Sequence, residues 1–139
     1  MFTRILVPLD GTPHSDKLVT HAHARDLAML TGASLHLLHV NVHQWIEGQD
    51  LTMEDAATAA TYLDQAQHSL SLAGIIVRGE ALTADSRDIT NAILQRSTPT
   101  ADNLIIMGAP HHTPWARLLS ENISDQISHT AGCPLLLIP

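Results

Sequence analysis

The fold is indicated most clearly by NLIIMGAPHHTPWARLLSENISDQISHTAGCPLLLIP, residues Asn103–Pro139. This segment predicts a buried strand over Leu104–Met107 and a loop that opens at Gly108. A helix near Ser120–Thr130 and a second buried strand over Leu135–Ile138 follow. A strand, loop and helix N-terminus in this order commonly bind anions, because unpaired N–H groups and the positive end of the helix dipole lie there. The main functional question is whether this loop holds a phosphate.

The N-terminal residues show the same alternation of strand and helix. Ile5–Pro8 is a short apolar run, which suits a strand covered on both faces. A helix is predicted to begin at Thr12 and Pro13, an N-cap residue and a first-turn proline, and to run to about Leu30. Gly32 is placed to end this helix in the left-handed conformation.

Two further pairs of strand and helix lie between these segments. Leu35–Val42 predicts the second strand and His43–Asp50 predicts a loop. The next helix extends from a capping-box-like start to a terminal glycine, over Thr52–Gly74. Ile75–Leu82 predicts the third strand, and Asp85–Asp88 opens the third helix. This alternation predicts one α/β domain with a parallel sheet, right-handed crossovers and helices on both faces.

The residues at the carboxyl ends of the strands are the binding candidates, because open parallel sheets bind ligands there, at the switch point of strand order. These residues are Asp10, Val40, Asn41, Met107 and Gly108. Ordinary structural roles are also open to them. Asp10 suits a helix start, Val40 and Met107 suit a core, and a glycine suits a turn.

The length and composition are those of one globular domain. The chain has 139 residues, of which 45% are hydrophobic and 15% are charged. No apolar run approaches the length of a membrane span, and the first residues lack the sections of a signal peptide. The one cysteine, Cys133, has no internal disulfide partner. We therefore expect a cytoplasmic protein that does not contact membranes.

The charge and the motifs exclude two classes of function. The formal net charge is −7 and no basic patch or stripe is present, so we expect no nucleic-acid partner. No nucleophile-elbow motif occurs in the sequence. We therefore expect no enzymatic activity and assign no catalytic residues.

The ten histidines suggest an alternative function. His14, His43 and the pair His111–His112 follow three different strands, so all of them could lie at one edge of the sheet and bind a transition metal. No close ligand spacing accompanies them, and we assign no metal ligands. His36 and His39, within the second strand, are expected to face the interior with polar partners.

Four segments closely resemble the universal stress protein family. They are ILVPLDG (Ile5–Gly11), GASLHLLHV (Gly32–Val40), ADNLIIMG (Ala101–Gly108) and GCPLLLI (Gly132–Ile138). The resemblance covers essentially the whole chain, residues 1–139, as one domain. It implies an open five-stranded parallel sheet of order 3-2-1-4-5, with an adenine nucleotide alpha hydrolase-like, Rossmann-like fold. It also implies a homodimer, often paired through the last strand, and in many members a bound ATP.

The phosphate loop departs from the family's pattern. Nucleotide-binding members carry a glycine, two residues, a glycine, nine residues, and a glycine followed by Ser or Thr. These positions are Gly108, His111, Glu121 and Asn122 in this chain. Glycines let backbone N–H groups approach phosphates closely, whereas His111 brings a ring there. Glu121 faces a phosphate with like charge, and two unit charges about 4 Å apart near a protein surface repel by roughly 4 kcal/mol. This alone could lower ATP affinity on the order of a thousandfold.

The adenosine side of the family site is intact in this sequence. By resemblance, Asp10 approaches the adenosine and Pro8 shapes the strand exit. The backbone of Val40 flanks the adenine, while Met107 and Gly108 line the floor. The complete set of cofactor-binding candidates is Pro8, Asp10, Val40, Met107, Gly108, His111, Arg117, Glu121, Asn122 and Ile123.

The resemblance and the altered loop together favour a non-catalytic, homodimeric stress-response protein. It would act by protein association, with weak or no ATP binding and at most weak binding of an adenosine-type ligand. A second interpretation is an ATP-binding regulatory protein in which Arg117, His111 or His112 contacts the phosphates. A third is the metal-binding protein built on the crevice histidines.

Overall fold

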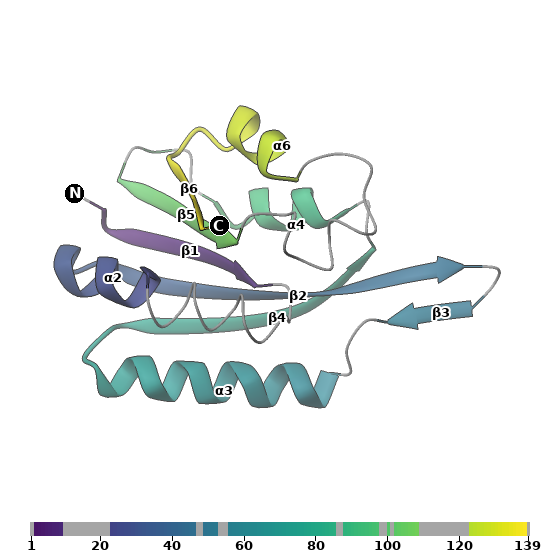
Figure 1. Cartoon of the computed structure of the whole chain (residues 1–139), viewed down its shortest axis with the longest axis horizontal. Coiled ribbons are helices and arrows are strands. Elements are labelled where there is room, and N and C mark those ends of the chain that lie inside the picture. The colour runs from purple at the N-terminus through teal and green to yellow at the C-terminus, as the bar shows by residue number, and fades with distance from the viewer. Residues whose placement is uncertain are drawn as a thin grey trace.

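The computed structural model describes residues 2–9, 23–46, 49–52, 56–85, 88–97, 100, 102–108 and 123–138 of the chain. Strands and helices alternate along these residues, and the helices cover a central sheet (Figure 1). The elements are β1 (Arg4–Leu9), α2 (Arg25–Thr31), β2 (Ser34–Ile46), β3 (Gln49–Thr52), α3 (Ala56–Leu72), β4 (Val77–Asp85), α4 (Ile89–Leu94), β5 (Asn103–Gly108), α6 (Ile123–Thr130) and β6 (Leu135–Ile138).

Five of the strands form a parallel sheet of order β4-β2-β1-β5-β6. This is the predicted order 3-2-1-4-5, which is confirmed. The chain moves outward from β1 through β2 to β4, and then crosses back to β5 on the other side of β1. The direction of strand addition therefore reverses between β1 and β5, which makes this pair the switch point of the sheet.

The helices lie on both faces of the sheet, as predicted, and each face has its own hydrophobic core. Side chains alternate across a strand, so Ile5, Val7 and Leu9 face one side and Leu6 faces the other. The first face packs against residues of α2 and α3, including Ala28 and Leu70. The second face packs against α4 and α6. Burial on both faces explains why β1 and β5 have continuous apolar sequences.

The predicted helix ends at two glycines are confirmed. Gly32 follows α2 with φ of 73°, and its N–H group donates to the Ala28 carbonyl oxygen at 2.9 Å. Gly74 follows α3 with φ of 84°. Both values lie in the left-handed region, where glycine carries no Cβ penalty.

The prediction of a loop over His43–Asp50 is wrong. β2 continues to Ile46, and β3 returns antiparallel beside it, with Ile46 paired to Gln49 and His43 paired to Thr52. Only two residues separate the strands in the sequence, which is the shortest common hairpin connection. The segment lacks the alternation of polar and apolar residues that predicts a strand, so no sequence signal indicated this part of β2 or β3.

The third strand is shifted toward the C-terminus, because β4 begins at Val77 rather than at Ile75. β4 ends at Asp85, where a helix was expected to open, and α4 begins only at Ile89. β4 pairs with β2 as far as His43. Pairing with a long neighbouring strand therefore overrides the local helix-start residues, as tertiary context commonly does.

The hairpin strand β3 lies on the same edge of β2 as β1. His43 is paired with both Thr52 of β3 and Asp85 of β4, and two strands paired to one residue must lie on opposite edges. β1 also lies opposite β4, and its pairing with β2 ends at Leu9 and His39. β3 therefore follows β1 along this edge, beyond the carboxyl end of β1.

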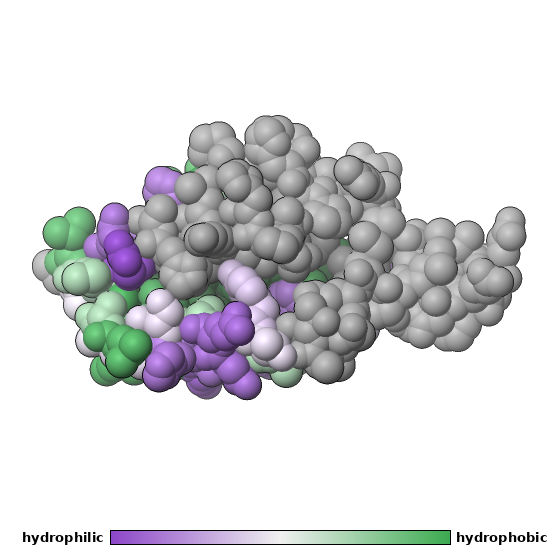
Figure 2. Space-filling model, turned by 60° about the horizontal axis from the view of Figure 1, so that its bottom comes forward, coloured by the Kyte–Doolittle hydropathy of each residue, from purple (hydrophilic) through white to green (hydrophobic). Residues whose placement is uncertain are grey.

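Exposed apolar side chains gather where α2 and α3 end. Met29, Leu30, Leu72 and Ile76 are exposed, and Figure 2 shows hydrophobic residues at that end of the molecule beside the polar surface of α3. This is the end at which β1, β2 and β4 begin. Among the described helices, none is long and apolar enough to cross a membrane.

Candidate functional site

The hydrogen-bonded pairing of β1 with β5 ends before the carboxyl ends of these strands. The two strands pair only from Arg4 and Asn103 to Leu6 and Ile105. Both strands continue for three more residues, β1 paired with β2 and β5 paired with β6. Open α/β sheets bind ligands in a crevice outside the carboxyl ends of their strands at the switch point, which lies between these two strands.

Pro8 explains why the pairing stops there. The Ser34 N–H group donates to the Thr3 carbonyl oxygen at 3.1 Å. Because backbone groups alternate along a strand, the N–H and C=O groups of odd-numbered residues in β1 point toward β2, and those of even-numbered residues point toward β5. After Leu6, the next residue of β1 whose backbone faces β5 is residue 8. Proline has no N–H group, so this bond cannot form.

The partner of this missing bond is the carbonyl group of Ile106. The Ile105 N–H group donates to Pro134 on the β6 side at 3.0 Å, so the peptide group of Ile106 points toward β1. Its carbonyl oxygen therefore faces the strand that cannot supply a donor. A backbone acceptor at the edge of the crevice suits a ligand that brings its own N–H or O–H donor.

Four of the predicted site residues lie around the end of this pairing. Pro8 is within β1, Val40 is within β2 just beyond the end of β1, and Met107 and Gly108 end β5. The side chains of Val40 and Met107 are 0% and 1% exposed and belong to the core of the second face. Only their backbone atoms are therefore available to a ligand, which is the contact predicted for Val40.

The remaining predicted residues are described partly or not at all. Ile123 is the first described residue of α6, and only its backbone is described. The other five lie outside the described residues, so their roles stay predictions: Asp10, His111, Arg117, Glu121 and Asn122.

Buried polar groups line β2 beneath the first-face helices. His39 is 0% exposed, and its ring centroid lies 6.2 Å from that of Tyr62 in α3, with the planes tilted by 40°. Asn41 is 6% exposed at the level where β1 has already ended. The interior placement of His39 was predicted. Tyr62 was missed, although it precedes the inward-facing Leu63 on α3 and is the one tyrosine of the chain.

A cluster of charged residues occupies the second face at the opposite, amino-terminal end of the strands. His36, 3% exposed, contacts Arg4, Arg78 and Glu80, so its predicted interior position and polar pairing are confirmed. Burial lowers the pKa of His36, and the charges of Arg78 and Arg4 lower it further. Hydrogen bonds from Arg96 lower the pKa of Glu80.

The other reactive groups give no sign of catalysis or metal binding in the described part of the chain. Burial raises the pKa of the Cys133 thiol, which favours its neutral and unreactive form. No group of three or more His, Cys, Asp or Glu side chains among the described residues is arranged to bind a metal. His14, His111 and His112 lie outside these residues, and only the backbone of His43 is described.

Comparisons with known proteins agree with this architecture. The sequence model of the universal stress protein family matches residues 1–139. A structure from this family from Burkholderia pseudomallei is 21% identical with a TM-score of 0.64, covering 99% of this chain and 96% of that chain. A search of curated proteins gives no match.

Two further solved structures contain nucleotides. A universal stress protein in complex with cAMP is 16% identical with a TM-score of 0.64, covering 99% of this chain and 96% of that chain. The universal stress protein from Archaeoglobus fulgidus in complex with dAMP is 19% identical with a TM-score of 0.60, covering 99% and 98%. At these identities the structural likeness establishes the fold.

Proposed function

Because this chain belongs to the universal stress protein family of stress-response proteins, we propose that it is a non-catalytic member that binds an adenosine-type ligand in preference to ATP. The ligand would occupy the crevice between β1 and β5. The protein would then act by association with other proteins rather than by chemical conversion of the nucleotide.

The end of the β1–β5 pairing at Pro8, at the switch point of the sheet, is the observation that carries this proposal. It supports a crevice at the switch point, with the Ile106 carbonyl group as an acceptor at its edge. The two relatives solved with cAMP and dAMP hold adenine nucleotides with a single phosphate. A ligand of that size needs the adenosine side of the crevice more than a long phosphate loop.

The sequence after Gly108 supports the preference against ATP. The family's second and third glycine positions are His111 and Glu121, so close backbone approach to phosphates is lost and a negative charge is added. A triphosphate carries more negative charge than a monophosphate or adenosine. The penalty from Glu121 therefore rises with the number of phosphates.

The last strand supports a homodimer. β6 pairs with β5 along one edge, and Leu136 and Leu137 are 37% and 40% exposed. An edge strand with exposed leucines favours pairing with a second chain. We place the protein in the cytoplasm, consistent with its single cysteine.

Thermal denaturation with added ligands tests the proposal. Adenosine or AMP at millimolar concentration should raise the melting temperature, and ATP at the same concentration and ionic strength should raise it less. Asp10→Asn should reduce the effect of adenosine, because Asp10 is the predicted adenosine contact. A large shift with ATP and none with adenosine would instead favour an ATP-binding regulatory protein.

A further inference from the structure

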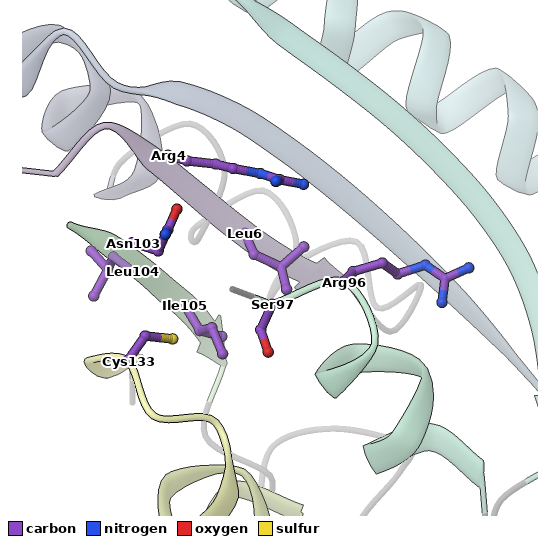
Figure 3. Close-up of a pocket in the computed structure, with 8 residues that line it drawn as sticks. All are labelled: Arg4, Leu6, Arg96, Ser97, Asn103, Leu104, Ile105 and Cys133. Carbon is purple, nitrogen blue, oxygen red and sulfur yellow. The ribbon is translucent and has the colours of Figure 1, made fainter. Parts of the chain in front are cut away.

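Three arginines and one glutamate surround a buried histidine on the second face of the sheet. The strand register brings these residues together. His36 in β2 is paired with Leu6 of β1 on one side and with Arg78 of β4 on the other. Glu80 lies two residues after Arg78, on the same face of β4. Arg4 extends from β1 toward β2 (Figure 3), and Arg96 follows α4. We call Arg4, His36, Arg78, Glu80 and Arg96 the arginine cluster.

His36 accepts a hydrogen bond at one ring nitrogen and donates one at the other. Its Nε2 atom lies 3.2 Å from Oε1 of Glu80. Its Nδ1 atom lies 3.3 Å from Nη2 of Arg4, and Nη2 of Arg78 is nearly equidistant from the two ring nitrogens, at 3.3 Å from Nδ1 and 3.4 Å from Nε2. Guanidinium groups only donate, so Nδ1 is the acceptor and the ring is neutral with its proton on Nε2. A neutral ring nitrogen has a single lone pair, which Arg4 can use, whereas the Arg78 nitrogen, nearly equidistant from both ring nitrogens, lies against the face of the ring.

Glu80 does not neutralise these two arginines. Its carboxylate is held by Arg96, with Nε–Oε1 and Nη2–Oε2 distances of 3.0 Å and 2.8 Å. Within the described part of the chain, neither Arg4 nor Arg78 is paired with a carboxylate. The cluster therefore carries more positive than negative charge, in a chain whose formal net charge is −7.

Arg4 and Arg78 are held close to one another. Each has a nitrogen 3.3 Å from the same histidine atom, so the two nitrogens are separated by no more than twice that distance. Two like charges at such a separation repel unless an anion lies between them. Guanidinium forks match the oxygen atoms of a phosphate, and two forks can share one such group.

We propose that the arginine cluster binds a phosphate-type dianion between Arg4 and Arg78, on the Nδ1 side of His36. Glu80 lies on the Nε2 side and is occupied by Arg96, so it does not compete for this position. Arg78 is exposed and Arg4 is half-buried, which leaves the position open to solvent.

This site is separate from the crevice between β1 and β5. Arg4 begins β1, whereas the crevice lies beyond Leu6, where the pairing of β1 with β5 ends. His36 and Arg78 lie in β2 and β4, on the side of β1 away from β5, whereas the crevice lies on the β5 side of β1. The inference does not depend on the proposed function.

The dianion can be either free inorganic phosphate or the phosphate group of a small phosphate monoester, because both present the same oxygen atoms and charge. A pocket adjoins the cluster on the β5 side and is lined by apolar and polar side chains, shown in Figure 3. The pocket is small, with room for about one water molecule, so only a very small ester group such as a methyl group fits beside the phosphate. Its lining residues are Arg4, Leu6, Arg96, Ser97, Asn103, Leu104, Ile105 and Cys133.

NMR titration of the full chain tests the proposal through the ring nitrogens of His36. Inorganic phosphate and methyl phosphate are added in separate experiments, with sodium chloride at matched ionic strength as the reference. We expect saturable shifts of the His36 ring signals with a phosphate species and not with chloride. Saturation by both species indicates that the phosphate group suffices, and saturation by methyl phosphate alone indicates that the ester is needed.

Charge-removing variants locate the site. Arg4→Gln and Arg78→Gln should each weaken phosphate binding about tenfold or more, since each removes charge-assisted hydrogen bonds. Arg25→Gln is the matched control, because Arg25 lies on α2 on the other face and is paired with Asp26. It should leave the affinity unchanged.

Three results would overturn the proposal. These are equal effects of phosphate and chloride on wild-type protein, the absence of saturation by either phosphate species, and an unchanged affinity in the Arg4→Gln, Arg78→Gln double variant. Because the double variant could alter the fold, its far-ultraviolet circular dichroism and its melting temperature are compared with those of Arg25→Gln. If it unfolds, the two single variants decide the outcome.

Discussion

The Nε2 atom of His36 lies 3.2 Å from Oε1 of Glu80, across the paired strands β2 and β4. This contact joins the interior of the sheet to its edge, because His36 is buried while Glu80 is partly exposed and bonded to Arg96. His36 and Glu80, which share this hydrogen bond, both have lowered pKa values. Each of them therefore makes the free energy of unfolding depend on pH.

Stability should fall in two steps as the pH is lowered. Burial and the neighbouring arginines lower the pKa of His36 in the folded chain from its usual 6.5, so the unfolded chain binds this proton first. The free energy of unfolding therefore decreases as the pH falls from about 6.5 toward the folded pKa. Arg96 lowers the pKa of Glu80 from 4.5, so a second decrease follows below that value.

Urea denaturation at a series of pH values measures these steps. His36→Gln should remove the upper step, whereas His68→Gln, an exposed position on α3, should leave it in place. An upper step of equal size in both variants would show that another group is responsible.

Loss of the Glu80 carboxylate should destabilise the fold more than loss of an exposed one. Glu80→Gln removes the partner of both Arg96 and His36, and we expect a decrease of about 1 kcal/mol in the free energy of unfolding. Asp26→Asn removes the partner of Arg25 in an exposed pair at 3.5 Å, where both side chains are about half exposed, and should cost much less. Chemical denaturation of the two variants side by side provides the comparison, and equal effects would contradict this assignment.

Replacement of Pro8 should extend the pairing of β1 with β5. Pro8→Ala supplies the N–H group that faces the Ile106 carbonyl oxygen, so the new amide should exchange with solvent as slowly as that of Leu6. Hydrogen exchange measured by NMR reports this directly. Narrowing of the crevice should also weaken adenosine binding. A rapidly exchanging amide at position 8 would show that something other than the proline ends the pairing.

The first-face core should depend strongly on α3. Leu70 is 0% exposed and belongs to this core, so Leu70→Ala should lower the free energy of unfolding by about 2–5 kcal/mol. Leu72 lies in the same helix but is 76% exposed, and Leu72→Ala should change stability little. Urea denaturation of both variants tests the orientation of α3, and a larger effect at Leu72 would contradict it.

The order of the sheet was implied by the family resemblance, whereas the alternation of strands and helices could be predicted from local sequence signals. Short apolar runs such as Ile5–Pro8 and Leu104–Met107 predict buried strands. Gly32 and Gly74 mark the ends of two of the helices. These signals are local, and they agree with the tertiary structure.

The hairpin and the arginine cluster could not be predicted in this way. β3 depends on pairing with the end of β2, and Asp85 joins β4 because β2 is long enough to hold it. The cluster joins Arg4, Arg78 and Arg96, which are far apart in sequence and meet only through strand register. The sequence predicted that His36 is paired, but it contained no information on its partners.

The binding site at the carboxyl ends of the strands stays a prediction, and the structure adds a physical reason for the end of the β1–β5 pairing there. Pro8 was expected to shape the strand exit, and the register shows that its missing N–H group coincides with the end of the β1–β5 pairing. The phosphate side depends on His111, Arg117 and Glu121, which lie outside the described residues. Their roles stay predictions from sequence.

Isothermal titration calorimetry with AMP and ATP, on the wild-type chain and on Glu121→Gly, tests the central claim most directly. We expect AMP to bind the wild-type chain at least about tenfold more tightly than ATP, and Glu121→Gly to narrow this difference by strengthening ATP binding. ATP binding to the wild-type chain as tightly as AMP, with no gain in Glu121→Gly, would contradict the account.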